Sequence, residues 1–313
     1  MFASVPAASR AAGPGNTMAL VHKVGWVADF ARRNPWFWPI ELVARRFETR
    51  RHWPTREDLA ALYAERASRV GAPPLRFAEN VRKRDKRADG RVALEALYDA
   101  RIALRGEVPT RECDWHDFFN ALCFATFPRA KHALHARQYA ALAARVRPED
   151  TRMPGARTRE QDALTLFDEG GAVIVATAEA AQALVVPGAD HDTAAALERA
   201  GVARVVPFGH ALFEHLVEGL RCPGGLTHIE VVDAIPRDDQ ALLDFVDHAL
   251  ARALADPRSF ASPRQGAPVR LAALGLAPGL SGAQRAEPRR RRASTSSAAS
   301  AASTESAPVA PRE

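Results

Sequence analysis

The segment DWHDFFNALCFATF, residues 114–127, is apolar around most of the circumference of a helix. Asp114 stands at the expected N-cap, and Asp117 follows three residues later at the position of a capping-box partner. A helix that is apolar all round is buried in the core of its protein. Pro128 then begins a second helix that we expect to continue to Val146. The two segments together predict a helical hairpin.

The chain before this hairpin is interpreted by the same periodicity. Helical spacing of apolar residues predicts two helices, and alternating spacing predicts two strands. The predicted elements are helices over 18–33 and 55–69 and strands over 76–80 and 98–104. The last one is ambiguous, because its alanines favour a helix. Asn34-Pro35 ends the first helix, and Thr55 with Asp58 forms a capping-box signature at the start of the second.

From about residue 160 onward, strands alternate with helices. The stretch LTLFDEGGAVIVA, residues 164–176, predicts a β-hairpin with Asp168 and Glu169 at a glycine-containing tip. The further predicted elements are helices over 177–184, 209–218 and from 238, and strands over 202–206 and 227–232. The predicted fold class is therefore α+β. A mainly helical N-terminal half is followed by a small sheet, the hairpin plus further strands, packed with helices.

Composition divides the chain into three parts. Of the 313 residues 47% are hydrophobic, which is enough to build a core. We expect residues 1–17 to be a flexible leader (with Met18 as an alternative start), 18–280 to be a single domain, and 281–313 to be a disordered basic tail rich in serine and alanine. That tail carries about half of the net charge of +6. Nucleic acid is therefore an unlikely partner.

The compartment is interpreted from what the sequence lacks. No apolar run approaches the ~18 residues that a membrane-spanning helix needs, so we expect no membrane association. Cys113, Cys123 and Cys222 are far apart and form no C-x-x-C pair, so neither a disulfide framework nor a zinc finger is indicated. We expect a cytoplasmic protein of bacterial type.

Common nucleotide-binding and hydrolase motifs are missing, so the cofactor is unknown and no metal ligands are predicted. His116-Asp117 resembles the metal-binding helices of HD-type phosphohydrolases. Those enzymes need a further upstream histidine, and none lies between His52 and His116. His132 and His135 are three residues apart and could bind a transition metal, but on an arginine-rich helix such residues are more typical of the surface.

The candidate site lies on the helix that opens at residue 115. His116 and Asn120 are four residues apart and share one face of it. In a buried helix such groups need partners, a ligand or water. We predict a polar pocket wall in which His116 is an acid or base, Asn120 orients substrate or water, and Asp117 contributes. Lys131 and His210 are possible additions. In the alternative interpretation, these polar side chains cap the helix or bond to neighbouring backbone.

Several blocks of the chain resemble the bacterial family known as domain of unknown function 3025. The blocks are GEVPTR (106–111), WHDFFNAL (115–122), FPRAK (127–131), REQDALTLFDE (159–169), FGHAL (208–212) and LGLAPG (274–279). The resemblance covers about residues 35–280 and implies that they form one unit. It implies no activity, cofactor or catalytic residue.

Three functions remain open from the sequence. The first is an enzyme, hydrolytic by default, or a binder of an unknown small molecule, with His116 and Asn120 in its pocket. The second is a non-enzymatic interaction module that contacts an anionic partner through the basic segment 82–91. In the third, residues 115–122 are simply part of the core and the protein has a structural role.

Overall fold

The computed structural model describes residues 24–80, 89–186, 191–220 and 225–265, all of which belong to one compact unit of the chain, residues 1–278. The helices are α1 (Phe30–Arg33), α2 (Trp38–Ala44), α3 (Arg56–Val70), α4 (Tyr98–Arg105), α5 (Trp115–Thr126), α6 (Pro128–Ala143), α7 (Arg159–Gly170), α8 (Ala178–Val185), α9 (His191–Ala200), α10 (His210–Glu218) and α11 (Asp239–Ala255). The strands are β1 (Arg76–Glu79), β2 (Glu107–Thr110), β3 (Ala172–Ala176), β4 (Ala203–Pro207) and β5 (Thr227–Val231). The predicted leader and tail lie outside the described residues.

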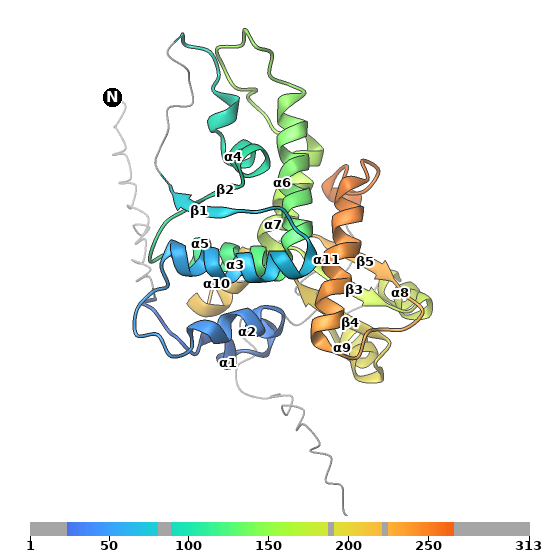
Figure 1. The fold of residues 1–313 in the computed structure, drawn as a ribbon. Coiled ribbons are helices and arrows are strands. Elements are labelled where there is room, and N and C mark those ends of the chain that lie inside the picture. The colour runs from blue at the N-terminus through green and yellow to red at the C-terminus, as the bar shows by residue number, and fades with distance from the viewer. Residues whose placement is uncertain (1–23, 81–88, 187–190, 221–224, 266–313) are drawn as a thin grey trace, which may run out of the picture. The chain divides into compact units, whose positions relative to one another are not determined.

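Helix α5 is the centre of the helical half, with α2 and α3 packed beside it (Figure 1). Its first turn joins a cluster of aromatic rings. Trp115 stacks on Trp26 at a centroid distance of 5.4 Å, and its indole N–H donates to the backbone carbonyl of Val24 at 2.8 Å. Phe30 and Phe118 close the cluster with edge-to-face contacts. Offset and T-shaped ring pairs of this kind add to the burial energy, so α5 is held firmly in place.

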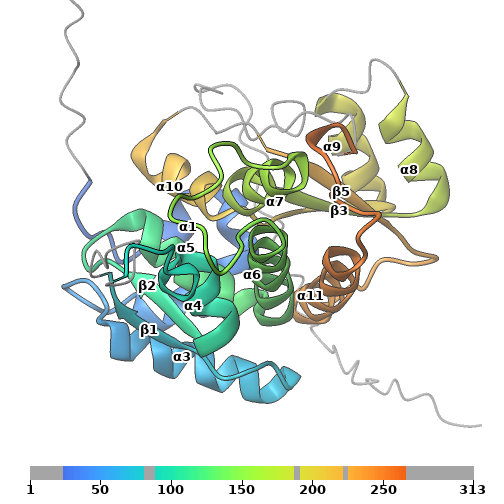
Figure 2. The ribbon, with the colours of Figure 1, turned by 90° about the horizontal axis from the view of Figure 1, so that it is seen from above.

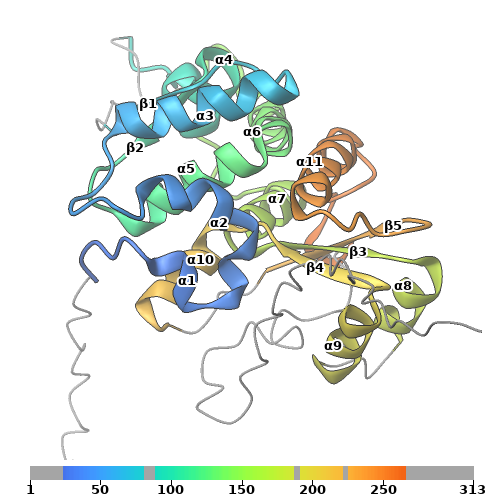
Figure 3. The ribbon, with the colours of Figure 1, turned by 60° about the horizontal axis from the view of Figure 1, so that its bottom comes forward.

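The second half is built on a mixed sheet of strand order β4-β3-β5, in which β3 runs antiparallel to β4 and parallel to β5. Val173 and Val175 of β3 pack with α6, α7 and α11, whereas Ile174 packs on the side of α8 and α9. Figure 3 shows these two layers of helices on opposite faces of the sheet. Together with a small parallel pair, β1 and β2, this arrangement confirms the α+β class.

Helix α6 connects the two halves. It contacts α4 on one side and α11 on the other, and it lies between them in Figure 2. Pro128 begins it, as predicted, but it ends at Ala143 rather than Val146. Its N-terminus is capped from another element, since the carboxylate of Asp247 on α11 accepts from the backbone N–H groups of Arg129 and Ala130. Orphan amides at a helix start need such a partner.

Two predicted elements are wrong. Residues 164–176 are not a hairpin, because 159–170 form α7, and Asp168 and Glu169 lie in its last turn. The capping box formed by Thr158 and Gln161 starts this helix and was the missed signal. Residues 98–104 are not a strand but helix α4, which Gly106 ends in the left-handed conformation.

The other predictions hold apart from two details. The helix over 55–69, with its capping box, and the strands over 76–80, 202–206 and 227–232 are confirmed. Within the predicted helix 18–33, residues 24–29 are not helical and only α1 is, while 18–23 lie outside the described residues. Asp114 caps α5, but the carboxylate of Asp117 binds Arg111 instead of completing a capping box.

Among the helices described, none is both long and apolar enough to cross a bilayer.

Candidate functional site

Glycines hold the end of α7 against the start of α10. The carbonyl of Gly171 accepts from the backbone N–H of Gly209 at 2.9 Å. A Cβ atom at Gly209 would lie 2.5 Å from the carbonyl oxygen of Glu169, and one at Gly225 would overlap the carbonyl of Gly170. Only glycine permits backbones to approach so closely. The side chains at the end of α7 are therefore fixed relative to those at the start of α10.

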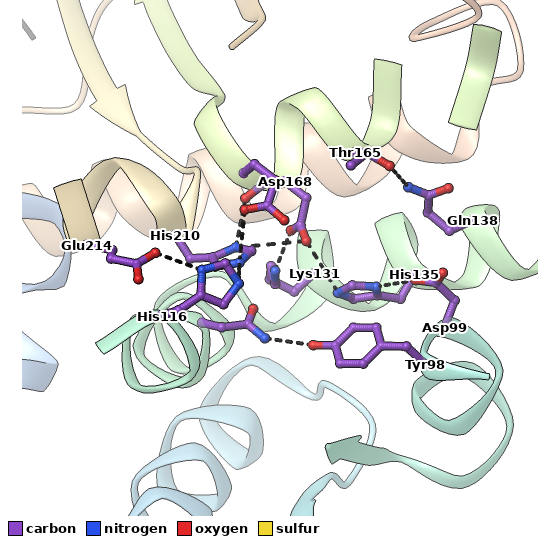
Figure 4. A network of polar contacts seen from close by, with 12 residues as sticks. Tyr98, Asp99, His116, Lys131, His135, Gln138, Thr165, Asp168, His210 and Glu214 are labelled. Atoms are coloured by element: carbon purple, nitrogen blue, oxygen red, sulfur yellow. Dashed lines mark hydrogen bonds and ion pairs between the residues drawn. The ribbon is translucent and has the colours of Figure 1, made fainter. Parts of the chain in front are cut away.

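Two histidines and two glutamates meet at this junction. Figure 4 shows His116, His210 and Glu214 close together. His116 comes from α5, and His210 is the first residue of α10. Their Nε2 atoms are 3.0 Å apart. The Oε2 atom of Glu169, on α7, lies 3.5 Å from Nε2 of His210, and Oε2 of Glu214, on α10, lies 2.8 Å from Nδ1 of His116. His116, His210 and Glu169 each bring one possible metal-ligating atom, and these atoms all lie within 4.8 Å of one another.

The outer nitrogens of both imidazoles are held by acceptors. Nδ1 of His210 lies 2.9 Å from the backbone carbonyl oxygen of Asp168, and Nδ1 of His116 faces the carboxylate of Glu214. Carbonyl and carboxylate oxygens only accept, so each Nδ1 carries the hydrogen. In the neutral ring, Nε2 then has a free lone pair. Both lone pairs face the same point.

Burial and charge set the protonation of these groups. Burial lowers the pKa of His210 well below its usual value, so this ring is neutral. Burial would also lower the pKa of His116, but the hydrogen bond to Glu214 and the charge of Glu169 outweigh it and raise that pKa. The pKa of Glu169 is raised, chiefly by burial. Groups with perturbed pKa values cluster at functional sites.

A second polar network adjoins the cluster of His116, His210, Glu169 and Glu214, and Asp168 links the two. Its carboxylate forms an ion pair with Lys131, which is wholly buried. Nε2 of His135 lies 4.0 Å from Oδ2 of Asp168, and Nδ1 of His135 lies 2.9 Å from Oδ1 of Asp99. Burial alone would raise the pKa of Asp168, but the charge of Lys131 and the hydrogen bond that its ammonium group donates hold that pKa well below its usual range.

Asn120 lies one turn after His116 and points toward α4. Its amide nitrogen donates to the hydroxyl of Tyr98 at 2.8 Å. Within the described part of the chain, two buried side-chain atoms have no hydrogen-bond partner, Oδ1 of Asn120 and Nε2 of His135. An unsatisfied buried polar atom costs about 1–3 kcal/mol, so these atoms are places where a water molecule would be bound.

The predicted site residues are only partly brought together. His116, His210 and Lys131 belong to the two connected networks, and Asn120 borders them. Asp117 is held elsewhere, because Arg111 donates to its carboxylate from the side chain at 2.9 and 3.0 Å and also from the backbone. The catalytic roles of His116, Asn120 and Asp117 stay predictions. The HD-type interpretation stays a prediction. The carboxylates that contact the two histidines of the site are those of Glu214 and Glu169.

Sequence reasoning missed all the acidic residues of the cluster. Asp168 and Glu169 were assigned to a hairpin tip, and Glu214 was not singled out. The capping box at Thr158 was the available signal, because it places residues 168 and 169 on a helix rather than in a turn. No local sequence pattern indicates Glu214. Its role depends on a contact with His116, which lies 98 residues earlier in the chain.

The remaining candidates lie apart from this cluster. His132 binds the hydroxyl of Tyr63, and His135 binds Asp99, so these two histidines do not form a metal pair. Most of the basic segment 82–91 lies outside the described residues. A cavity of about 460 Å³ lies among α2, α3 and α11, and His116 does not line it. The predicted side chains therefore converge at a partly exposed junction and not in that cavity.

Comparison with known proteins identifies the family. A family model described as a protein of unknown function (DUF3025) matches residues 87–287. The match contains His116, Glu169, His210 and Glu214, and it begins later than the residue 35 expected from the resemblance. No curated protein and no solved structure matches significantly. The chain belongs to the DUF3025 family.

Proposed function

We propose that this chain is a hydrolytic enzyme whose reaction centre is the point between Nε2 of His116, Nε2 of His210 and the carboxylate of Glu169. The observation that supports it is the convergence of these three acceptors from three different helices. Two of the three side chains are partly open to solvent, since that of His116 is 29% exposed and that of Glu169 is 39% exposed.

The arrangement suits the chemistry of hydrolysis. An attacking water must lose a proton, and the leaving group must gain one. Imidazoles and carboxylates are the side chains that most often carry out these transfers. In the proposed reaction, a water held between the acceptors is oriented toward the substrate, and Glu169 takes its proton. Glu214 keeps the ring of His116 in the required orientation.

The residues around the centre have supporting roles in this proposal. Lys131 fixes Asp168, and the carbonyl of Asp168 fixes His210. Asn120 positions α4 through Tyr98 and offers a free carbonyl oxygen to a water. We place the enzyme in the cytoplasm of a bacterium, a compartment where the exposed thiol of Cys113 stays reduced.

The test is a hydrolase screen with the full-length chain. Chromogenic carboxylic esters, amides and phosphate esters would be incubated with the wild type and with the variants Glu169→Gln and His116→Gln. Loss of an acid or base in the centre lowers the rate by about 100-fold or more. Glu179→Gln and His248→Asn are matched controls, because both residues are exposed and lie on other helices.

Circular dichroism and thermal unfolding would verify that all the variants are folded. We expect at least one substrate class to be hydrolysed by the wild type and the controls but not by the two site variants. The proposal fails if the wild type hydrolyses nothing faster than His116→Gln, or if the controls lose as much activity as the site variants.

A further inference from the structure

We infer that the point between His116, His210 and Glu169 binds a divalent transition-metal ion, with zinc as the ion that fits best. The ligands are the Nε2 atoms of both histidines and the carboxylate of Glu169. The inference deepens the proposed function, because the ion would activate the attacking water. The binding site itself rests on geometry that does not depend on that function.

The orientation of the two imidazoles favours a metal ion at this point. Each Nδ1 donates to an oxygen, so in the neutral rings two nitrogen lone pairs face each other across 3.0 Å. Two lone pairs at this distance repel unless a positive centre lies between them. A shared proton would satisfy the two nitrogens only. A metal ion would satisfy both of them and also the carboxylate of Glu169, whose oxygen lies 3.5 Å from Nε2 of His210.

The spacing of the ligand atoms is close to that of a tetrahedral metal site. Ligand atoms about 2.0–2.1 Å from a tetrahedral ion are about 3.3 Å from each other. The observed separations of 3.0 Å and 3.5 Å lie on either side of that value. The third separation, between Glu169 and His116, is within 4.8 Å, so a bound ion would draw these two ligands together. The partly exposed side chain of Glu169 lets water approach the ligands.

The groups around the ligands are those that usually surround metal-binding histidines. A metal-binding histidine usually donates its other N–H to a carboxylate or a backbone carbonyl, which fixes the tautomer and the ring orientation. His116 does this with Glu214, and His210 does it with the carbonyl of Asp168. The glycine contacts of Gly209 then fix the backbone on which His210 and Glu169 meet. The site is preorganised by contacts outside the ligands.

The donor set selects the kind of ion. Two imidazole nitrogens and one carboxylate are the ligands of several catalytic zinc sites, in which water takes the fourth position. Calcium and magnesium prefer oxygen ligands throughout. Ferrous iron also accepts two histidines and a carboxylate. Metal analysis of the purified protein would therefore identify the ion, and iron in place of zinc would keep the site while weakening the hydrolytic proposal.

With zinc bound, the proposed hydrolysis is balanced as follows. Glu169 is then a ligand of the ion and no longer the group that takes the proton of the water. The ion lowers the pKa of its water to about 7, and the water releases a proton to the solvent. The resulting hydroxide forms a bond to the electrophilic carbon or phosphorus of the substrate. The bond to the leaving group breaks, and the leaving group takes up a proton from water. No oxidant or reductant is needed.

The test is a titration of the chelator-treated, full-length chain with Co²⁺, which reports its ligands by visible absorption, followed by competition with Zn²⁺. We expect about one ion per chain and intense absorption from a site of low coordination number. His116→Gln and Glu169→Gln should each weaken binding by about 100-fold. Glu214→Gln, which removes a charge beside a ligand, should weaken it by about 10- to 100-fold. The exposed-residue variants Glu179→Gln and His248→Asn should bind as the wild type does.

Two results would overturn the inference. One is that the folded wild type binds neither ion at one per chain. The other is that His116→Gln and Glu169→Gln bind as tightly as the wild type, which would assign the ion to other residues. Stoichiometric binding without hydrolysis of any substrate would keep the site and remove the proposed function. Hydrolysis by a chain that binds no ion, and that survives treatment with a chelator, would remove the metal site and keep the proposed function.

Discussion

The completely buried ammonium group of Lys131 forms an ion pair with the carboxylate of Asp168. Removing one member of a buried pair leaves an uncompensated charge, which costs about 3–5 kcal/mol. We therefore expect Lys131→Met and Asp168→Asn each to lower the free energy of unfolding by that amount. The double variant should lose about 2 kcal/mol less than the sum of the two. Urea denaturation measures all three, and additive losses would show that the pair is not coupled.

The pH dependence of stability should contain a contribution from His132. Burial and the charge of His135 lower its pKa from 6.5 to about 4, and its ring nitrogen lies 2.8 Å from the hydroxyl of Tyr63. A lowered pKa means that the native state binds the proton less tightly than the unfolded chain. Neutral His132 therefore makes its full contribution to the free energy of unfolding above about pH 6.5. This contribution, up to about 3 kcal/mol, is lost as the pH falls toward 4.

Replacing His132 by Gln should flatten this part of the profile. Unfolding free energies at several pH values between 7.5 and 4.5 would be compared for the wild type, His132→Gln and the exposed control His248→Gln. The control should keep the slope of the wild type. A slope that is unchanged in His132→Gln would show that other groups cause the acid sensitivity.

An added methyl group at Gly209 should disturb the site. Its Cβ would meet the carbonyl of Glu169 and the backbone nitrogen of Gly171, and a shift of the backbone is needed to make room. We expect Gly209→Ala to cost about 1–3 kcal/mol and to weaken binding of Co²⁺. Gly155, which has open space around it, is the matched control. Gly155→Ala should leave the thermal unfolding temperature unchanged or raise it slightly.

The hydroxyl of Tyr98 should stabilise the fold through a single contact. It accepts the hydrogen bond of the Asn120 amide, whose oxygen already lacks a partner. Tyr98→Phe leaves that buried amide without any bond, and the expected loss is about 1–3 kcal/mol. Tyr139→Phe, on α6, tests the effect of removing a hydroxyl elsewhere and should cost little. Equal losses in the two variants would contradict the importance of this contact.

Local signals in the sequence account for most of the helices. Thr55 and Asp114 begin helices where predicted, because a cap and its partner are close in sequence. The segment 98–104 was misread because its apolar residues fit both periods, and its burial against α6 decides for a helix. The hairpin error has another cause. Asp-Glu-Gly-Gly also ends a helix well, so turn chemistry alone could not distinguish the two.

The site is predictable only in part. A histidine on an otherwise apolar helix stands out, so the sequence predicts His116 as a site residue, with His210 as a possible addition. Glu169 and His210 join it through the register of β3 with β4 and through the glycine contacts, which depend on residues far apart in the chain. The sequence pattern around each of these residues contains no information about the distance to the others.

The aromatic cluster around α5 has a consequence for how the chain can be shortened. The family match begins at residue 87, but Trp26 and Phe30 lie before it and pack on Trp115 and Phe118 within it. A protein cut at the family boundary would present these bare rings to water, and a large apolar patch of this kind promotes aggregation. The segment shared by the family and the segment that can fold by itself therefore begin at different residues.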